Sequence, residues 1–232
     1  MKKLFGFLFL FVCLFALVAC GSKDNSGTNP SGDGTGEKDP DPQPQTDVDS
    51  DVSDAFKGIA SGKKIYLTTC GQSDVDIVEI ILSGLIEENE DAMKANFDGK
   101  STYEEIVTRK DSLKAEEVED GSVVFVVVGG SNKGLGAAGT DVSKETQRAA
   151  DFASAKGRIT LIVLHVGKQA RRGDTSDPII RAVAPSAKLL MVVNDGDFDG
   201  YFAGVAKANS IEYHQYSKNP KLAPSFLKML CK

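Results

Sequence analysis

The stretch 123–141, VVFVVVGGSNKGLGAAGTD, joins a run of apolar residues to a glycine-rich segment. Residues 123–128 are all Val or Phe, which predicts a strand buried on both faces, because a half-exposed strand would alternate apolar and polar residues. Five glycines and Lys133 follow within the same stretch. Glycines behind a strand let a ligand, or another piece of chain, come close to the backbone. The stretch therefore raises the questions of which fold surrounds this strand and what the glycines accommodate.

Further strand-like runs alternate with helical patterns to the end of the chain, and four of the runs are continuously apolar. We expect strands at 64–70, 122–128, 158–166, 188–194 and 211–217, and helices at 73–88, 142–155, 176–183, 199–208 and 223–232. Pro178 falls in the first turn of its helix, where a missing N–H costs little. Strands buried on both faces and joined by helices indicate a mainly parallel sheet with right-handed crossovers. The sequence thus predicts an α/β fold: a three-layer αβα, doubly wound sandwich of five to six strands, flavodoxin- or Rossmann-like.

Residues 89–121 carry a weaker pattern than the rest. TYEEIVTRK (102–110) is interpreted as an edge strand and SLKAEEVED (112–120) as a short helix.

Four polar or glycine-rich segments, 68–74, 129–141, 167–177 and 194–200, each follow a predicted strand. The carboxyl ends of parallel strands share one edge of the sheet, and ligands of open α/β sheets bind there. We therefore expect a pocket at this edge for a small polar or anionic ligand. The candidate ligand-binding residues are Gly71, Gln72, Gly130, Ser131, Asn132, Lys133, Gly134, Gly136, Lys168, Arg171, Arg172 and Asp195.

The segment KQARRGDTSD contributes most of the positive charge to these candidates. Arg171 and Arg172 could join Lys133 in a cationic rim, because a planar guanidinium suits carboxylate or phosphate. The alternative is that Asp174 or Thr175 caps the next helix while the arginines stay solvated. The quoted segment itself could also be a plain surface loop, although it is longer than the roughly two to six residues usual for such a connection.

The spacing Gly134-Leu-Gly136-Ala-Ala-Gly139 matches a dinucleotide fingerprint, and the segment from Gly130 to Gly136 resembles the nucleotide loop of short-chain dehydrogenases. In that family the loop follows the first strand, and a Tyr with a Lys four residues later completes the site. Here a strand and helix precede the loop, and none of the five tyrosines has that lysine. The following strand ends His165-Val-Gly without an acid for the ribose. The sequence therefore favours a polar-ligand site over a dinucleotide site, and it does not identify a cofactor.

Two weaker patterns could carry chemistry. DGDFDG (195–200) resembles the start of a calcium loop, but the twelfth position is Ala206, so these acids are interpreted as turn formers and a helix N-terminal charge, and no metal site is predicted. Cys70 and His165 both lie near strand ends and are the candidates for a catalytic thiol and its base. One cysteine and one histidine are weak evidence for a hydrolase, so the sequence favours a non-enzymatic role and keeps an enzyme as the alternative.

The N-terminus has a separate role. Lys2 and Lys3 precede an apolar run that ends in Leu17-Val18-Ala19-Cys20, which resembles the lipobox of bacterial lipoproteins. The resemblance implies a signal peptide over 1–19, a diacylglyceryl group on Cys20 and an extracytoplasmic, membrane-anchored protein. Residues 20–56 would be the lipidated cysteine and a disordered acidic tether, because they have little to bury. Residues 57–232 would form a single domain.

Charge and cysteines narrow the class of protein further. The net charge of −6 divides into +2 for the signal peptide, −7 for residues 21–56 and −1 for residues 57–232. A domain without a basic bias is not expected to bind nucleic acid. Cys70 and Cys231 are predicted at opposite ends of the fold and are expected to stay free thiols.

Much of the domain, including VVVGGSNKGLGAAGTDV, HVGKQARRGDTSDPIIRAVAPSAKLLMVV and DGDFDGYFAGVAKANSI, resembles an uncharacterised bacterial family, domain of unknown function 6305. The resemblance covers roughly residues 63–217 and implies an extracytoplasmic α/β domain without supplying an activity. Two functions are expected from the sequence: a lipid-anchored module that binds a small polar or anionic ligand or, as the alternative, a surface enzyme that is a hydrolase or depends on a nucleotide. A purely structural role remains open.

Overall fold

The computed structural model describes residues 48–232, and the predicted signal peptide, Cys20 and most of the predicted tether lie outside the described residues. The described chain forms a six-stranded sheet in which every neighbouring pair is parallel, in the order β2-β1-β3-β4-β5-β6. The strands are β1 Ile65–Cys70, β2 Val107–Arg109, β3 Val123–Val128, β4 Thr160–His165, β5 Leu189–Val193 and β6 Glu212–Tyr216.

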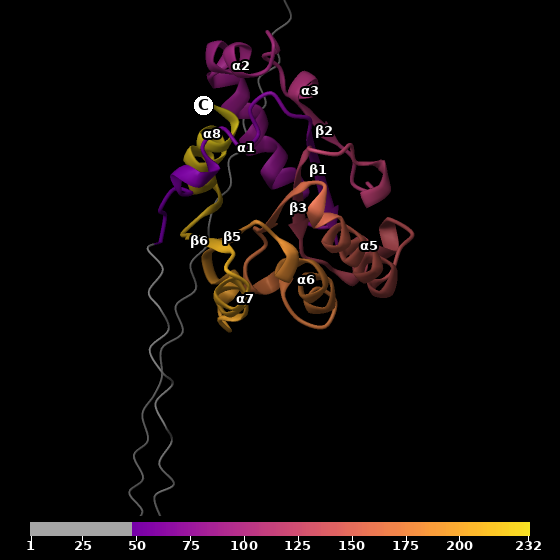
Figure 1. The fold of residues 1–232 in the computed structure, drawn as a ribbon. Helices are drawn as coiled ribbons and strands as arrows, with labels where there is room; N and C mark the ends of the chain where they lie inside the picture. The colour runs from indigo at the N-terminus through magenta and orange to yellow at the C-terminus, as the bar shows by residue number, and fades with distance from the viewer. Residues whose placement is uncertain (1–47) are drawn as a thin grey trace, which may run out of the picture. The chain divides into compact units, whose positions relative to one another are not determined.

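Helices cover both faces of the sheet, which makes three layers (Figure 1). The helices are α1 Val75–Glu88, α2 Glu90–Asn96, α3 Tyr103–Ile106, α4 Asn132–Ala137, α5 Val142–Ser154, α6 Asp177–Val183, α7 Tyr201–Asn209 and α8 Ala223–Leu230. One apolar core lies between the sheet and α1 and α8, and a second lies between the sheet and α5, α6 and α7. The predicted doubly wound α/β fold is confirmed.

The continuously apolar strands owe their composition to these two cores. In β3, Val123, Phe125 and Val127 pack in the first core, and Val124, Val126 and Val128 pack in the second. Successive side chains point to opposite faces of a strand, so a strand in the middle layer buries all of them. Every residue of β1, β3 and β5 is buried.

The region 89–121 differs from its prediction in three places. The predicted edge strand begins as the short helix α3, and only residues 107–109 pair with β1. Residues 90–96 form α2, which the sequence analysis did not identify. The predicted helix at 112–120 is a single 3-10 turn at Ala115–Glu117, because the carbonyls of Ala115 and Val118 accept hydrogen bonds from Arg158 and turn the chain.

The last residues assigned to the tether belong to the domain. Val52 and Phe56 are 0% and 3% exposed, and the N–H of Asp49 donates to the carbonyl of Gln215 in β6 at 2.9 Å. Ser53 donates two hydrogen bonds to the carboxylate of Glu212, also in β6. The segment therefore covers the otherwise open edge of β6, where unpaired strand groups need partners. Two buried apolar residues and these hydrogen bonds dock the segment, so the domain begins no later than residue 49 instead of at residue 57.

Candidate functional site

The order in which strands are added to the sheet reverses between β1 and β3: β2 lies on one side of β1, and β3 to β6 follow on the other side. The connection after β1 runs through α1 on one face, and the connection after β3 runs through α5 on the other face. In open parallel sheets the two diverging connections leave a crevice at the carboxyl ends of such a strand pair. The quoted glycine-rich segment follows β3 and therefore forms one side of this crevice.

An open groove of about 430 Å³ lies at this point. We call it the β1/β3 groove. Its lining residues are Gln72, Ser73, Asp74, Asp76, Ile77, Ser131, Lys133, Gly134, Ala137 and Arg171. Five of them, Gln72, Ser131, Lys133, Gly134 and Arg171, belong to the ligand-binding candidates read from the sequence. Three chain segments that are distant in sequence thus meet in one groove, as the parallel strand directions require.

The segment after β3 is not a plain loop. It contains α4, whose N-cap residue Ser131 accepts a hydrogen bond from the N–H of Gly134 at 3.1 Å. A serine at this position satisfies a helix N–H that has no partner within the helix. The short helix explains the unusual length of the connection and sets Lys133 on the wall of the groove.

The glycines of the segment serve contacts within the protein. Gly71 has a φ of +106°, and a Cβ on it would run into the carbonyl of Gly129. A Cβ on Gly134 would lie 2.7 Å from the carbonyl oxygen of Gln72. The N–H of Gly130 already donates to the hydroxyl of Ser176 at 2.8 Å. These three glycines therefore let the loops after β1 and β3 pack on one another. Gly136, by contrast, faces open space.

Four non-glycine residues in the loops directly after the strands have positive φ. They are Gln72 and Asp74 after β1, Lys168 after β4 and Asn194 after β5. Lys168, with φ 60° and ψ −169°, lies in a region that is almost exclusive to glycine. Strained backbone of this kind persists only where the surroundings hold it, and it concentrates at functional sites.

Arg171 and Asp74 face each other in the groove. The Nε of Arg171 lies 3.3 Å from Oδ2 of Asp74, and the arginine side chain is 39% exposed. The hydroxyl of Ser73 donates to the same carboxylate oxygen at 2.6 Å. A single long contact leaves most of the guanidinium available to another acceptor, because the group carries five N–H donors.

Arg172 has a different position from the one predicted. Its side chain is 2% exposed, pairs with Asp177 and Asp199 at 2.8 Å each, and donates to the carbonyl of Gly196 at 2.7 Å. It also lies 5.3 Å from the ring centroid of Phe202. All of this ties the loop after β4 to the loop after β5. Arg172 is therefore not part of a cationic rim, because its charge is used inside the protein.

Three other candidates lie at the same edge and outside the groove lining. The carboxylate of Asp195 accepts a hydrogen bond from the N–H of Gln169 at 3.2 Å, and the amide oxygen of Asn132 accepts one from Thr175 at 3.1 Å. The carbonyl of Lys168 lies 3.0 Å from Nε2 of His165. These contacts hold the loops together, so the residues share one edge of the sheet and support the groove.

The acids of DGDFDG have the role interpreted from the sequence. The carboxylate of Asp197 accepts hydrogen bonds from the N–H groups of Phe202 and Ala203 in the first turn of α7, at 2.7 and 2.9 Å. Asp199 pairs with Arg172. Anionic oxygens at a helix start satisfy its free donors and its dipole.

Cys70 and His165 are both 0% exposed. Burial raises the pKa of the Cys70 thiol to about 12, so the thiol is protonated at neutral pH. Both ring nitrogens of His165 face backbone carbonyls, with Nδ1 2.9 Å from the oxygen of Val128. A nucleophile needs thiolate character and access to its substrate, and its base needs a nitrogen free to take the proton. The proposed catalytic pair does not meet these conditions. Cys70 and Cys231 are free thiols, as expected.

Sequence reasoning missed a buried ion pair beneath the groove. Glu145 and Arg148 in α5 form a salt bridge, and their side chains are 5% and 12% exposed. The other contacts of the Glu145 carboxylate are the N–H of Gly71 at 2.9 Å and the hydroxyl of Thr140 at 3.2 Å. The pair therefore anchors the turn after β1. An i,i+3 acid–base pair in a helix is usually solvated, so the sequence carried no signal for this burial.

Five groove residues were not among the candidates read from the sequence: Ser73, Asp74, Asp76, Ile77 and Ala137. Ser73 and Asp74 are part of the polar segment 68–74, so the pattern that identified the edge of the sheet also pointed to them. Ile77 and Ala137 were assigned to helix packing or to a loop, and only their position beside the groove marks them as site residues.

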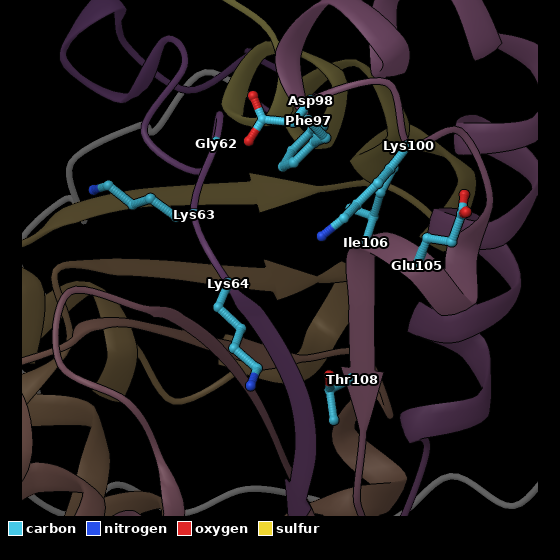
Figure 2. A pocket seen from close by; sticks show the side chains of 9 residues that line it. All are labelled: Gly62, Lys63, Lys64, Phe97, Asp98, Lys100, Glu105, Ile106 and Thr108. Atoms are coloured by element: carbon cyan, nitrogen blue, oxygen red, sulfur yellow. The ribbon is translucent and has the colours of Figure 1, made fainter.

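A second pocket, of about 280 Å³, lies at the opposite edge, between the start of β1 and the residues around α3. Figure 2 shows that its three lysines point in different directions: Lys100 extends into the space, while Lys63 points away from it. Lys64 pairs with Glu119 at 2.6 Å. The carboxylate of Glu105 is occupied by the N–H groups of Ser101 and Thr102. The charged groups of this second pocket therefore do not converge on one ligand.

Comparisons with curated proteins and with solved structures gave no match. One family model, described as a domain of unknown function, matches residues 62–230, which include all six strands and the β1/β3 groove. The match covers well over half of the chain and agrees with the resemblance read from the sequence. The chain belongs to the family of domain of unknown function 6305.

Proposed function

We propose that this protein is a binding module that holds a small polar ligand with an anionic group in the β1/β3 groove. The observation that carries the proposal is the pair of available cations there. Lys133 has no carboxylate within 4 Å among the described residues, and Arg171 makes one contact of 3.3 Å. Cations that a protein leaves unpaired in a concave polar site are suited to bind an anion.

The rigid surroundings support a binding role. The loops that carry Gln72, Lys133 and Arg171 are fixed by backbone contacts, by the buried Glu145–Arg148 pair and by Arg172. A site that is organised before the ligand arrives loses less entropy on binding. An enzyme that uses Cys70 and His165 is not supported, because both side chains are sealed in the core.

A thermal-shift screen of the purified protein against amino acids, short peptides, other carboxylates, phosphate and phosphorylated metabolites tests this proposal. A ligand that binds only the folded state raises the melting temperature. We expect the shift to be lost in Lys133→Gln combined with Arg171→Gln, and retained in Lys63→Gln combined with Lys100→Gln at the opposite edge. A shift that survives the first pair of changes, or the absence of any shift, would contradict the proposal.

We propose in addition that Cys20 is lipidated and anchors the domain at the outer face of a bacterial membrane. The support is the sequence LVAC after an apolar run, because Cys20 lies outside the described residues. No helix within residues 48–232 is long and apolar enough to span a membrane. Expression with radiolabelled palmitate should label the wild-type protein and leave Cys20→Ser unlabelled. Equal label in both would refute the anchor at Cys20.

A further inference from the structure

The β1/β3 groove carries charges of both signs on different elements. Lys133 on α4 and Arg171 after β4 supply the positive charge, and Asp74 and Asp76 at the start of α1 supply the negative charge. A ligand in the groove therefore meets charges of both signs, and Arg171 and Asp74 also contact each other. A purely anionic ligand would lie against two carboxylates, and like charges at contact distance are unfavourable.

The acidic side keeps a negative charge after its internal ion pairs are considered. Arg109 contacts three carboxylates: Asp76 at 2.7 Å, Asp111 at 2.9 Å, and Glu79. One guanidinium cannot neutralise three carboxylates, so the cluster carries a net negative charge. Asp76 is its member in the groove, and its side chain is 76% exposed. A cation of the ligand can reach Asp76 without breaking the Arg109 cluster.

The cationic side also keeps a charge to spare. Asp74 engages only the Nε of Arg171, and Lys133 has no acidic partner in the described chain. Ile77 and Ala137 supply an apolar part of the lining alongside the charged groups. The groove thus combines positive charge at Lys133 and Arg171, exposed negative charge at Asp76 and a small apolar surface.

We infer that the ligand is a zwitterion with an ammonium and a carboxylate on one short frame, that is, an amino acid or a short peptide with free ends. The ammonium would lie toward Asp76 and Asp74, and the carboxylate toward Lys133 and Arg171. The apolar surface of Ile77 and Ala137 would take an aliphatic side chain. This inference rests on the proposed function and names the class of its ligand.

The test uses isothermal titration of the full-length protein, purified in detergent, with three probes: L-alanyl-L-leucine, its N-acetyl derivative and its C-terminal amide. Each blocked form lacks one of the two end charges. We expect the free dipeptide to bind at least tenfold more tightly than either blocked form.

Two variants test which groove residue binds each end charge of the dipeptide. Asp76→Asn should abolish the preference for the free dipeptide over the acetylated form and keep the preference over the amide. Lys133→Gln should do the reverse. Asp98→Asn and Lys100→Gln, at the opposite edge of the sheet, are matched controls that should change neither ratio.

The outcomes separate this inference from the proposed function. Binding of the acetylated form as tightly as the free dipeptide, lost in Lys133→Gln, would overturn the zwitterion and leave an anion site. Binding of anions in the thermal-shift screen with no binding of the dipeptide would have the same meaning. If neither the screen nor the titrations detect a ligand, both proposals fail.

Discussion

Two adjacent arginines at the carboxyl edge of the sheet have opposite surroundings. Arg171 is 39% exposed in the open β1/β3 groove, with one long contact to Asp74. The Arg172 side chain is 2% exposed and contacts Asp177, Asp199 and Gly196, which tie the loops after β4 and β5 together. The two have the same side chain and neighbouring positions, so residue type does not distinguish them. The difference shows that the surrounding loops, and not the residue type, decide whether an arginine stays available to a ligand or is used in ion pairs that hold the fold together.

The largest expected effect tests this difference directly. Arg172→Gln should lower the free energy of unfolding by about 2–3 kcal/mol. Removing one partner of a fully buried ion pair costs roughly 3–5 kcal/mol, and the two acids here keep partial exposure. Arg171→Gln should cost less than about 1 kcal/mol, because exposed pairs contribute little. Urea unfolding of the two variants measures both values, and equal losses would remove the distinction between groove and scaffold.

The next effect concerns two glycines of α4, the helix that carries Lys133 at the groove. Gly134→Ala should destabilise the protein by about 1–2 kcal/mol, because its Cβ would lie 2.7 Å from the carbonyl oxygen of Gln72 and force a backbone shift. Gly136→Ala in the same helix meets nothing within 4 Å and should stabilise by about 0.4–1 kcal/mol. Thermal unfolding of the matched pair tests the packing. A neutral Gly134→Ala would mean that the loops after β1 and β3 are not in contact there.

The smallest effect concerns His165, whose ring contacts the carbonyl of Val128 at the end of β3 and the carbonyl of Lys168 in the loop after β4. It thus links the strand before the groove segment to the loop that carries both arginines. Burial lowers the pKa of His165 below its ordinary value of 6.5, and the two carbonyls act in the opposite direction. The unfolded chain then binds a proton that the native protein does not bind. Stability should therefore fall as the pH is lowered from about 6.5 toward the native pKa.

The measurement is nitrogen NMR of the imidazole rings, together with urea unfolding at pH 7 and 5.5. The chain has only two histidines, so His214→Gln leaves the signal of His165 alone. We expect a neutral ring at pH 7. A neutral ring has one N–H and can donate to only one of the two carbonyls, whereas a charged ring would donate to both. A charged His165 at pH 7 would show that the carbonyls outweigh burial, and the pH dependence would then reverse.

Sequence patterns were sufficient for the sheet. The apolar runs of β1, β3, β4 and β5 predicted a parallel sheet, because only a middle layer buries both faces of a strand. The same argument placed Gln72, Lys133 and Arg171 at one edge, since parallel strands end together. Local capping chemistry was also readable, as Pro178 at the start of α6 and Asp197 before α7 illustrate.

Contacts between distant segments were not readable from the sequence. The exposure of Arg171, the burial of Arg172, the sealing of Cys70 and the docking of Val52 depend on loops that meet only in three dimensions. The burial of Glu145 against the N–H of Gly71 is of the same kind. The alternation of apolar and polar residues is local and determines which elements form and which way the strands run. Burial and ion pairing are set by neighbours far along the chain, so only the tertiary structure decided which charges remained available in the groove.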